Sequence, residues 1–144
     1  MIKIICIGKL KENYLKEGIS DYLKRINKYH KIEIIELPDS NAINEEKEIL
    51  KHIDNKDYLI GMCIEGENLS SLELSQKIDK SFITNSCITF IIGGSDGLSE
   101  NIKNKCNYKL SFSKLTYPHG LFRLILLEQI YRSFKILNHE SYHK

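Results

Sequence analysis

The first residues that could do chemistry form a glycine-rich turn, GGSDG at residues 93–97, directly after the apolar run 87–92. Glycine has no Cβ, so backbone N–H groups in such a turn can approach a ligand closely. The spacing is neither G-x-G-x-x-G nor a P-loop, which needs a lysine followed by serine or threonine to grip phosphate and magnesium. Taken alone, the pattern favours an ordinary tight connection between strand and helix over a binding loop.

A second polar segment, SKLTYPHG at residues 113–120, follows the strand expected at 108–112 and precedes a long helix. In open parallel sheets, ligands bind outside the carboxyl ends of the strands, where the strand order reverses. If this loop meets the glycine turn there, the two form a pocket. The alternative is that Pro118 only opens the helix and His119 is a surface residue. Spacing alone does not separate these interpretations.

The helix expected at 118–137 carries a wider apolar stripe than one sheet face needs, which indicates that part of it faces another subunit. Its polar residues include Arg123, Glu128 and Arg132. Glu128 and Arg132 have the spacing of a helix-surface ion pair, worth roughly 0.3 to 0.5 kcal/mol. Alternatively, the two arginines beside an apolar face hold phosphate.

The C-terminal sequence from His139 to His143 matches H-E-x-x-H, the signature of zinc metallopeptidases. That signature needs both histidines on one face of a stable helix and a third ligand, whereas this segment follows the end of the apolar pattern. We therefore expect no metal site. No cysteine pair has the spacing of a zinc or redox motif, so we expect buried, reduced thiols at Cys6, Cys63, Cys87 and Cys106.

These residues are placed by alternating strand and helix patterns. Apolar runs of four to eight residues rich in isoleucine alternate with amphipathic stretches, which is typical of a mostly parallel sheet with helices on its faces. Ser70 and Glu73 form a capping-box pattern that starts one helix. The expected strands cover 2–7, 32–37, 58–64, 87–92 and 108–112, and the expected helices cover 15–26, 44–54, 70–80, 99–105 and 118–137.

Length and composition indicate a single α/β domain over residues 1–144, because chains divide into further domains only at roughly 250 residues. The composition, 42% hydrophobic and 28% charged, is ordinary for a soluble protein. No apolar run approaches the ~20 residues of a membrane span, and the N-terminus lacks a signal-peptide pattern, so we expect a cytoplasmic protein. A net charge of +2 neither requires nor excludes a nucleic-acid partner.

Several motifs together carry a resemblance that covers the whole chain. They are FIIGGSDGL at 90–98, LSFSKLTYPH at 110–119, EQIYR at 128–132 and YHK at 142–144, with IGKLK at 7–11 and IELPD at 35–39. In these motifs the chain resembles the RlmH family of SPOUT-class methyltransferases. That resemblance implies methyl transfer from S-adenosylmethionine to N3 of a pseudouridine in helix 69 of bacterial 23S rRNA. It also implies a C-terminal trefoil knot, a rare feature among folds.

The resemblance implies site residues by matching motif positions. The family builds its site across a homodimer, in which the tail of one subunit completes the cofactor pocket of the other. Residues implied to position the base are therefore Tyr142, His143 and Lys144, with His119, Arg123, Glu128 and Arg132 as second candidates. The implied S-adenosylmethionine site comprises Met62, Gly93, Phe112, Ser113, Lys114, Leu115, Thr116 and Tyr117.

The chain departs from the family pattern at a few positions. The stretch 39–57 is shorter than in many relatives, Cys63 stands where we expect an acidic residue, and Glu67 where a basic one is common. Two rival functions are a non-catalytic RNA-binding dimer and a dinucleotide enzyme, but the latter needs G-x-G-x-x-G after the first strand, where IGKLK stands. The modest charge favours the assembled ribosome, rather than free RNA, as substrate.

Overall fold

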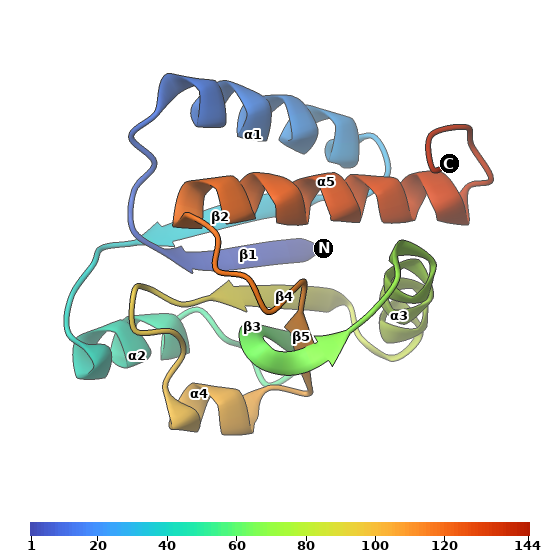
Figure 1. Ribbon diagram of the computed structural model, residues 1–144. Coiled ribbons are helices and arrows are strands. Elements are labelled where there is room, and N and C mark those ends of the chain that lie inside the picture. Colours follow the sequence, from blue (N-terminus) through green and yellow to red (C-terminus); the bar gives the residue numbers. More distant parts are fainter.

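Five strands form one parallel sheet in the computed structural model, which describes residues 1–144 (Figure 1). Their order is β2-β1-β4-β3-β5, and every neighbouring pair runs parallel. The expected α/β fold with a mostly parallel sheet is therefore confirmed. The strands are β1 (Ile2–Ile7), β2 (Ile32–Leu37), β3 (Asp57–Asn68), β4 (Cys87–Ile92) and β5 (Tyr108–Ser111).

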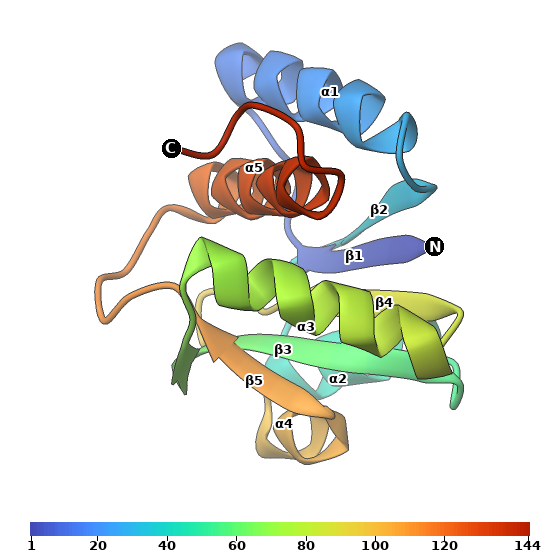
Figure 2. The same ribbon diagram turned by 90° about the vertical axis from the view of Figure 1, so that its right-hand side faces the viewer.

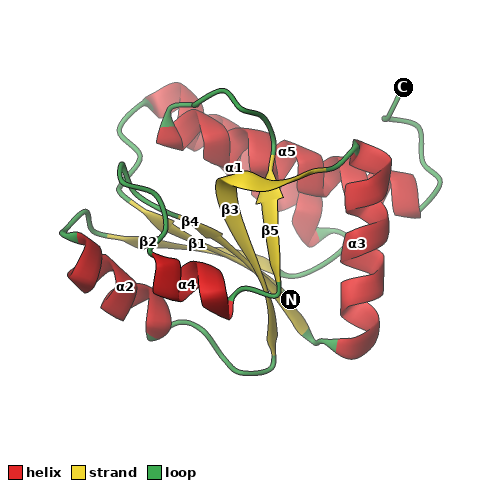
Figure 3. Ribbon diagram, turned by 60° about the horizontal axis from the view of Figure 1, so that its bottom comes forward, coloured by secondary structure: helices red, strands yellow, loops and turns green.

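Helices cover both faces of the sheet. Helix α5 (His119–Leu137) packs between α1 (Asn13–Asn27) and α3 (Ser71–Thr84) on one face (Figure 2). Helices α2 (Ala42–Leu50) and α4 (Glu100–Lys105) cover the other face (Figure 3). None of these helices has both the length and the apolarity to cross a membrane.

The alternation of side chains along the strands divides the core between these two faces. In β1, Ile2 and Ile4 join the large apolar cluster under α1, α3 and α5, while Ile5 and Ile7 join the smaller one under α2 and α4. Successive strand residues point to opposite faces, so an unbroken apolar run marks a strand that is covered on both sides. Strand β4 is buried along its whole length for this reason.

The capping box at the start of α3 is present as expected. The Ser70 hydroxyl accepts from the Glu73 backbone N–H at 3.1 Å, and the Glu73 carboxylate accepts from the Ser70 N–H at 2.9 Å. Each bond satisfies a backbone donor that has no partner within the helix. The box therefore fixes the point at which the chain turns from β3 into α3.

Replacing Ser70 with alanine is expected to lower the free energy of unfolding by about 1 kcal/mol, because the Glu73 N–H loses its acceptor. Urea denaturation measures this loss. Ser20→Ala is the matched control, since Ser20 is exposed within α1 and makes no cap. Equal stability of the Ser70 and Ser20 variants would contradict the prediction.

Several elements differ from their expected bounds: α3 runs to Thr84 rather than 80, and α2 ends at Leu50 rather than 54. Helix α2 begins two residues earlier than expected, because the Asn41 side chain accepts from the Asn44 N–H at 2.9 Å and caps it there. Strand β3 extends to Asn68 rather than ending at 64. After an irregularity that follows Met62, it pairs with β5 again, and Gly66 makes this possible: a Cβ there would lie 2.7 Å from the Leu110 backbone.

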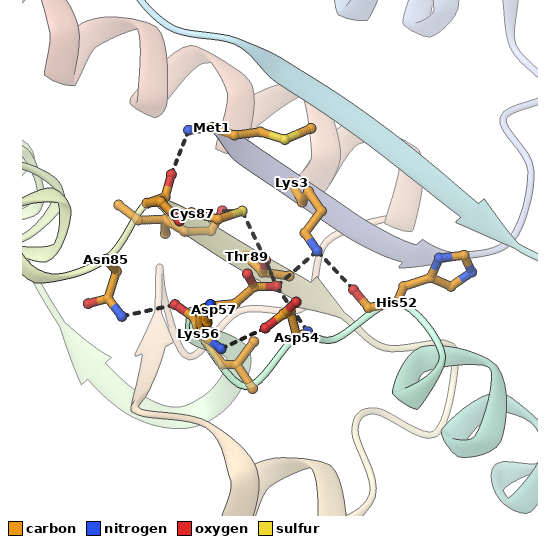
Figure 4. Close-up of polar contacts among 12 residues, drawn as sticks. Met1, Lys3, His52, Asp54, Lys56, Asp57, Asn85, Cys87 and Thr89 are labelled. Atoms are coloured by element: carbon orange, nitrogen blue, oxygen red, sulfur yellow. Dashed lines mark hydrogen bonds and ion pairs between the residues drawn. The ribbon is translucent and has the colours of Figure 1, made fainter.

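A buried polar cluster ties three strands together at their amino ends (Figure 4). The Lys3 ammonium lies 2.9 Å from the Asp57 carboxylate, which also accepts from the Thr89 hydroxyl at 3.1 Å. Lys3 also donates to the His52 carbonyl at 2.9 Å. The side chains of Lys3 and Asp57 are only 14% and 6% exposed. This cluster lies at the opposite end of β4 from the glycine turn, so it supports the sheet rather than the candidate site.

Candidate active site

A cavity of about 420 Å³ opens at the carboxyl ends of β3, β4 and β5. The glycine turn at 93–97 and the loop after β5 both line it. The two loops suspected from the sequence therefore do meet, at the edge where open parallel sheets bind ligands. The volume lies in the range of small-molecule sites.

The glycine turn forms one wall by folding tightly on itself. The Gly97 N–H donates to the Gly94 carbonyl at 3.0 Å. Gly93 is packed against this turn: a Cβ there would lie 2.5 Å from the Gly97 carbonyl carbon and 2.8 Å from the Leu98 nitrogen, both backbone atoms. Gly97 adopts a φ of +76°, which favours glycine, and a Cβ on it would have open space around it. A ligand can thus approach the Gly97 backbone closely.

The loop after β5 forms the facing wall. Its shape is held by the Ser111 hydroxyl, which donates to the Ser113 carbonyl at 3.0 Å, and by the Ser113 hydroxyl, which accepts from the Leu115 N–H at 2.8 Å. Two half-buried aromatic rings in this wall, Phe112 and Tyr117, pack against Phe122 of α5 at centroid distances of 5.3 and 5.9 Å. The wall therefore offers apolar aromatic surface beside the backbone of the loop.

Seven of the eight residues expected to bind the cofactor line this cavity. Lys114 is the exception, because it is exposed and does not contribute to the lining. The seven residues are Met62, Gly93, Phe112, Ser113, Leu115, Thr116 and Tyr117.

The two candidate residues at the start of α5 have different surroundings. His119 is exposed and lines the cavity. Arg123 is only 2% exposed, and its guanidinium donates to the Glu36 carboxylate at 2.7 Å and to the Ile7 and Gly8 carbonyls at 3.0 and 2.7 Å. Arg123 is therefore absent from the cavity lining and instead ties α5 to the carboxyl ends of β1 and β2.

The other candidates gather at the far end of α5. The Arg132 Nε donates to the Glu128 carboxylate at 3.0 Å, so the ion pair suggested by their spacing is formed. The Tyr142 hydroxyl donates to the same carboxylate at 3.1 Å, and the Arg132 guanidinium lies 3.2 Å from the His143 Nδ1. Burial raises the pKa of Tyr142. Lys144 is exposed.

These two groups of residues are separated along α5. The helix rises 1.5 Å per residue, so His119 at the cavity and Arg132 in the tail cluster lie about 20 Å apart along its axis. Figure 1 shows the C-terminus at the opposite end of α5 from the loop after β5. Within one chain, the expected cofactor residues therefore gather at the cavity, whereas the expected tail residues lie far from it.

The H-E-x-x-H sequence does not form a helical pair of histidines. Helix α5 ends at Leu137, and His139 has a φ of +56°, outside the helical region. Between the histidines, the Glu140 carboxylate accepts from the Tyr29 hydroxyl at 2.8 Å and from the Lys135 ammonium at 3.1 Å. Glu140 thus anchors the tail to α1 and α5. No group of three or more potential metal ligands occurs in the structure.

The cavity wall contains an ion pair that no sequence motif indicates. Lys103 of α4 contacts the Glu65 carboxylate of β3, and both residues line the cavity. Their hydrogen bond raises the pKa of Lys103 and lowers that of Glu65. Cys63, in the same wall, is half-buried, as is Cys106, so the expectation of four buried cysteines is wrong for these two. The only available signal was the replacement of an expected acidic residue by Cys63.

Comparisons with known proteins agree with the motifs. Residues 1–143 match the family described as "Predicted SPOUT methyltransferase". Two relatives, from Clostridium botulinum (strain 657 / Type Ba4) and Streptococcus agalactiae serotype III (strain NEM316), are both named "Ribosomal RNA large subunit methyltransferase H". Each is 48% identical to this chain, over 99% of both proteins.

A structural comparison supports the same fold. The solved structure of a TrmH/SpoU tRNA modifying enzyme from A. aeolicus matches 95% of this chain and 77% of its own, with a TM-score of 0.50 and 11% sequence identity. At that identity the likeness concerns the fold alone. From the family match and the two full-length relatives, the chain belongs to the SPOUT methyltransferase family and, within it, to the RlmH group.

Proposed function

We propose that this chain transfers a methyl group from S-adenosylmethionine to large-subunit ribosomal RNA, at N3 of a pseudouridine in helix 69 of 23S rRNA. The observation that carries the proposal is the cavity at the carboxyl ends of β3, β4 and β5, where seven of the expected cofactor residues converge. The names of the full-length relatives support the reaction and the RNA. The choice of nucleotide follows from the resemblance to the RlmH family.

The cavity fits the proposed methyl donor in size and chemistry. Its volume of about 420 Å³ suits a nucleoside-sized ligand, and the half-buried rings of Phe112 and Tyr117 offer apolar surface for a purine. The open space beside Gly97 leaves backbone groups free to bond polar edges. We assign the donor to Met62, Gly93 and the loop 112–117, in which Lys114 serves as a loop residue between lining neighbours.

S-adenosylmethionine supplies a methyl group on a positively charged sulfur, whose charge is lost on transfer. The residues of the chain must therefore hold donor and base in line, which contributes most when the reacting atoms are already positioned. His119 lies at the cavity, where it can contact the target base. Arg123 is a positioning residue, because its bonds to the Ile7 and Gly8 carbonyls fix the start of α5. A basic group near the base favours its ionised form without having to accept its proton.

The active form in this proposal is a homodimer. The tail residues Tyr142, His143 and Lys144 follow the C-terminal end of α5, where Glu128 and Arg132 contact Tyr142 and His143, and this end lies too far from the cavity of the same chain. A second copy can place its tail there. A groove beside the cavity, between the start of α3 and α5, provides surface for such a contact. Its lining is mixed: apolar residues such as Leu69, Leu74 and Ile125 lie beside the polar residues Ser70, Ser71 and Gln129.

The substrate and the chain path complete the proposal. A net charge of +2 is small for a protein that binds RNA alone, which favours the assembled ribosome in the cytoplasm as substrate.

We also propose that the C-terminal part forms a trefoil knot. In support, β5 lies at the sheet edge outside β3, yet the chain returns across the sheet so that α5 packs between α1 and α3 (Figure 2).

Transfer of labelled methyl from S-adenosylmethionine to ribosomes that lack the modification tests this function. Mass spectrometry of the digested RNA is expected to find the methyl group on N3 of the helix 69 pseudouridine. Ribosomes that already carry the modification are the control and should accept no label. Transfer to a different nucleotide would overturn the proposed target. No transfer by a folded dimer that binds S-adenosylmethionine would instead indicate a non-catalytic RNA-binding protein.

A further inference from the structure

The ion pair between Glu65 and Lys103 lies in the wall of the proposed cofactor cavity, a position that its contribution to folding does not explain. Both side chains line the proposed cofactor cavity, and Lys103 is the only lysine or arginine that does so. The Lys103 side chain is 17% exposed and that of Glu65 is 52% exposed. An ion pair with one solvent-exposed partner is screened by water, so this pair contributes little to holding α4 against β3.

The pair can also open without leaving Lys103 unpaired. The Glu100 carboxylate, one turn earlier in α4, lies 3.6 Å from the Lys103 ammonium. Lys103 therefore keeps a partner of opposite charge if Glu65 turns toward a ligand. The remaining acidic group in the lining is Asp96, at an exposed position of the glycine turn. The wall thus presents one cation and one adjacent, releasable anion to the cavity.

A ligand that matches this wall carries both charges close together. S-adenosylmethionine has such a group, because its amino-acid end bears a carboxylate and an ammonium on the same carbon. Charged groups removed from water need partners of opposite charge, and the aromatic wall offers none. The only charged side chain of the glycine turn is Asp96, which is exposed. Cys63 cannot serve as a negatively charged partner for the ligand ammonium, because burial raises the pKa of its thiol and keeps the thiol neutral.

We propose that Lys103 and Glu65 bind the amino-acid end of S-adenosylmethionine. The Lys103 ammonium pairs with the carboxylate of the ligand, and the Glu65 carboxylate pairs with the ammonium of the ligand. This inference rests on the proposed function, and it assigns the two residues as determinants of cofactor specificity. The aromatic wall and the glycine turn then bind the adenosine part. Glu65 supplies the carboxylate that the resemblance leads one to expect at position 63.

Two ligands that differ only at this end separate the proposal from a structural role. S-adenosylhomocysteine carries the amino-acid end, and 5′-methylthioadenosine lacks it; neither donates a methyl group. By calorimetry, Lys103→Met is expected to weaken binding of S-adenosylhomocysteine roughly tenfold or more, the effect of losing a charged hydrogen bond. Binding of 5′-methylthioadenosine should stay within about twofold. Lys105→Met, an exposed lysine of the same helix outside the cavity, is the matched control and should change neither affinity.

The ratio of the two affinities is measured on one protein, so a general loss of folding cancels. Glu65→Gln should lower the affinity for S-adenosylhomocysteine relative to that for 5′-methylthioadenosine. Lys103→Arg should preserve most of this ratio because the charge remains. An unchanged ratio in Lys103→Met and Glu65→Gln would show that the pair is only structural. If the wild-type protein bound both ligands equally, this inference alone would fail; if it bound neither, the proposed function would fail with it.

Discussion

Replacing Gly93 with alanine is expected to weaken S-adenosylhomocysteine binding at least about 100-fold and to abolish methyl transfer. The added Cβ would lie 2.5 Å from the Gly97 carbonyl carbon and 2.7 Å from its oxygen. Both are backbone atoms, which cannot turn aside as a flexible side chain would. The turn at 93–97 must therefore move, and with it the cavity wall that it forms.

Calorimetric titration with S-adenosylhomocysteine and thermal unfolding of the same samples measure the effect. Gly18→Ala is the matched control, because a Cβ at Gly18 would meet only the flexible Leu124 side chain, at 3.1 Å. Gly18 lies within α1, where alanine is favoured over glycine by about 1 kcal/mol. The control should retain its affinity. Normal binding by a folded Gly93 variant would show that the turn does not shape the site.

Local sequence was sufficient for most elements whose bounds a local interaction decides, although it missed the Asn41 cap that starts α2. Strands β1, β2 and β4 have the bounds expected from their apolar runs, because β1 and β4 lie inside the sheet and β2 is bounded by polar residues. The start of α3 follows from a hydrogen-bond pair between Ser70 and Glu73 that the sequence itself encodes. The general rule for parallel sheets allowed the two loops to meet, but spacing left this open and the structure decided it.

Contacts between distant segments could not be predicted in this way. The second half of β3 is polar, and it is a strand only because Glu67 and Asn68 pair with β5. Arg123 is of a residue type that often binds ligands, but its partners are the Ile7 and Gly8 carbonyls and the Glu36 carboxylate, all far away in the sequence. Lys103 and Glu65 belong to no motif, and only the packing of α4 beside β3 reveals them as a pair.

The candidate site illustrates the same limit. The motifs at 110–119 and 128–132 lie close together in the sequence, which suggests that their residues form one continuous site. A helix converts that adjacency into separation, since each residue adds 1.5 Å along one axis. Sequence alone thus supplied the residues of both groups, whereas their positions at opposite ends of α5 give the physical reason for proposing a second subunit.

At the amino ends of the strands, Asp57→Asn is expected to lower the free energy of unfolding by about 3 kcal/mol, because it leaves the buried Lys3 ammonium without its counter-charge. The substitution keeps the size of the side chain, so packing is preserved. Lys3, 14% exposed, would keep the His52 carbonyl as a partner but would lose the only carboxylate with which it forms an ion pair (Figure 4). Urea denaturation at neutral pH measures the loss.

The pH dependence of this loss identifies its cause. Burial alone would raise the pKa of Asp57, but the bonds from Lys3, the Asp54 N–H and Thr89 outweigh it and hold the pKa below its usual value. A carboxyl with a depressed folded-state pKa stabilises the fold above its unfolded pKa of about 3.9, and this contribution disappears as the pH falls through the folded pKa. The wild-type advantage over Asp57→Asn should thus be constant from neutral pH to about 4 and shrink below it.

Two further variants separate this effect from a general response to losing a carboxylate. Asp79→Asn, at an exposed position of α3 without an ion pair, should change stability by less than about 0.5 kcal/mol at any of these pH values. Adding Lys3→Met to Asp57→Asn should recover part of the loss, because it removes the stranded charge. If the double variant were less stable than Asp57→Asn alone, packing of the lysine stem rather than its unpaired charge would explain the loss.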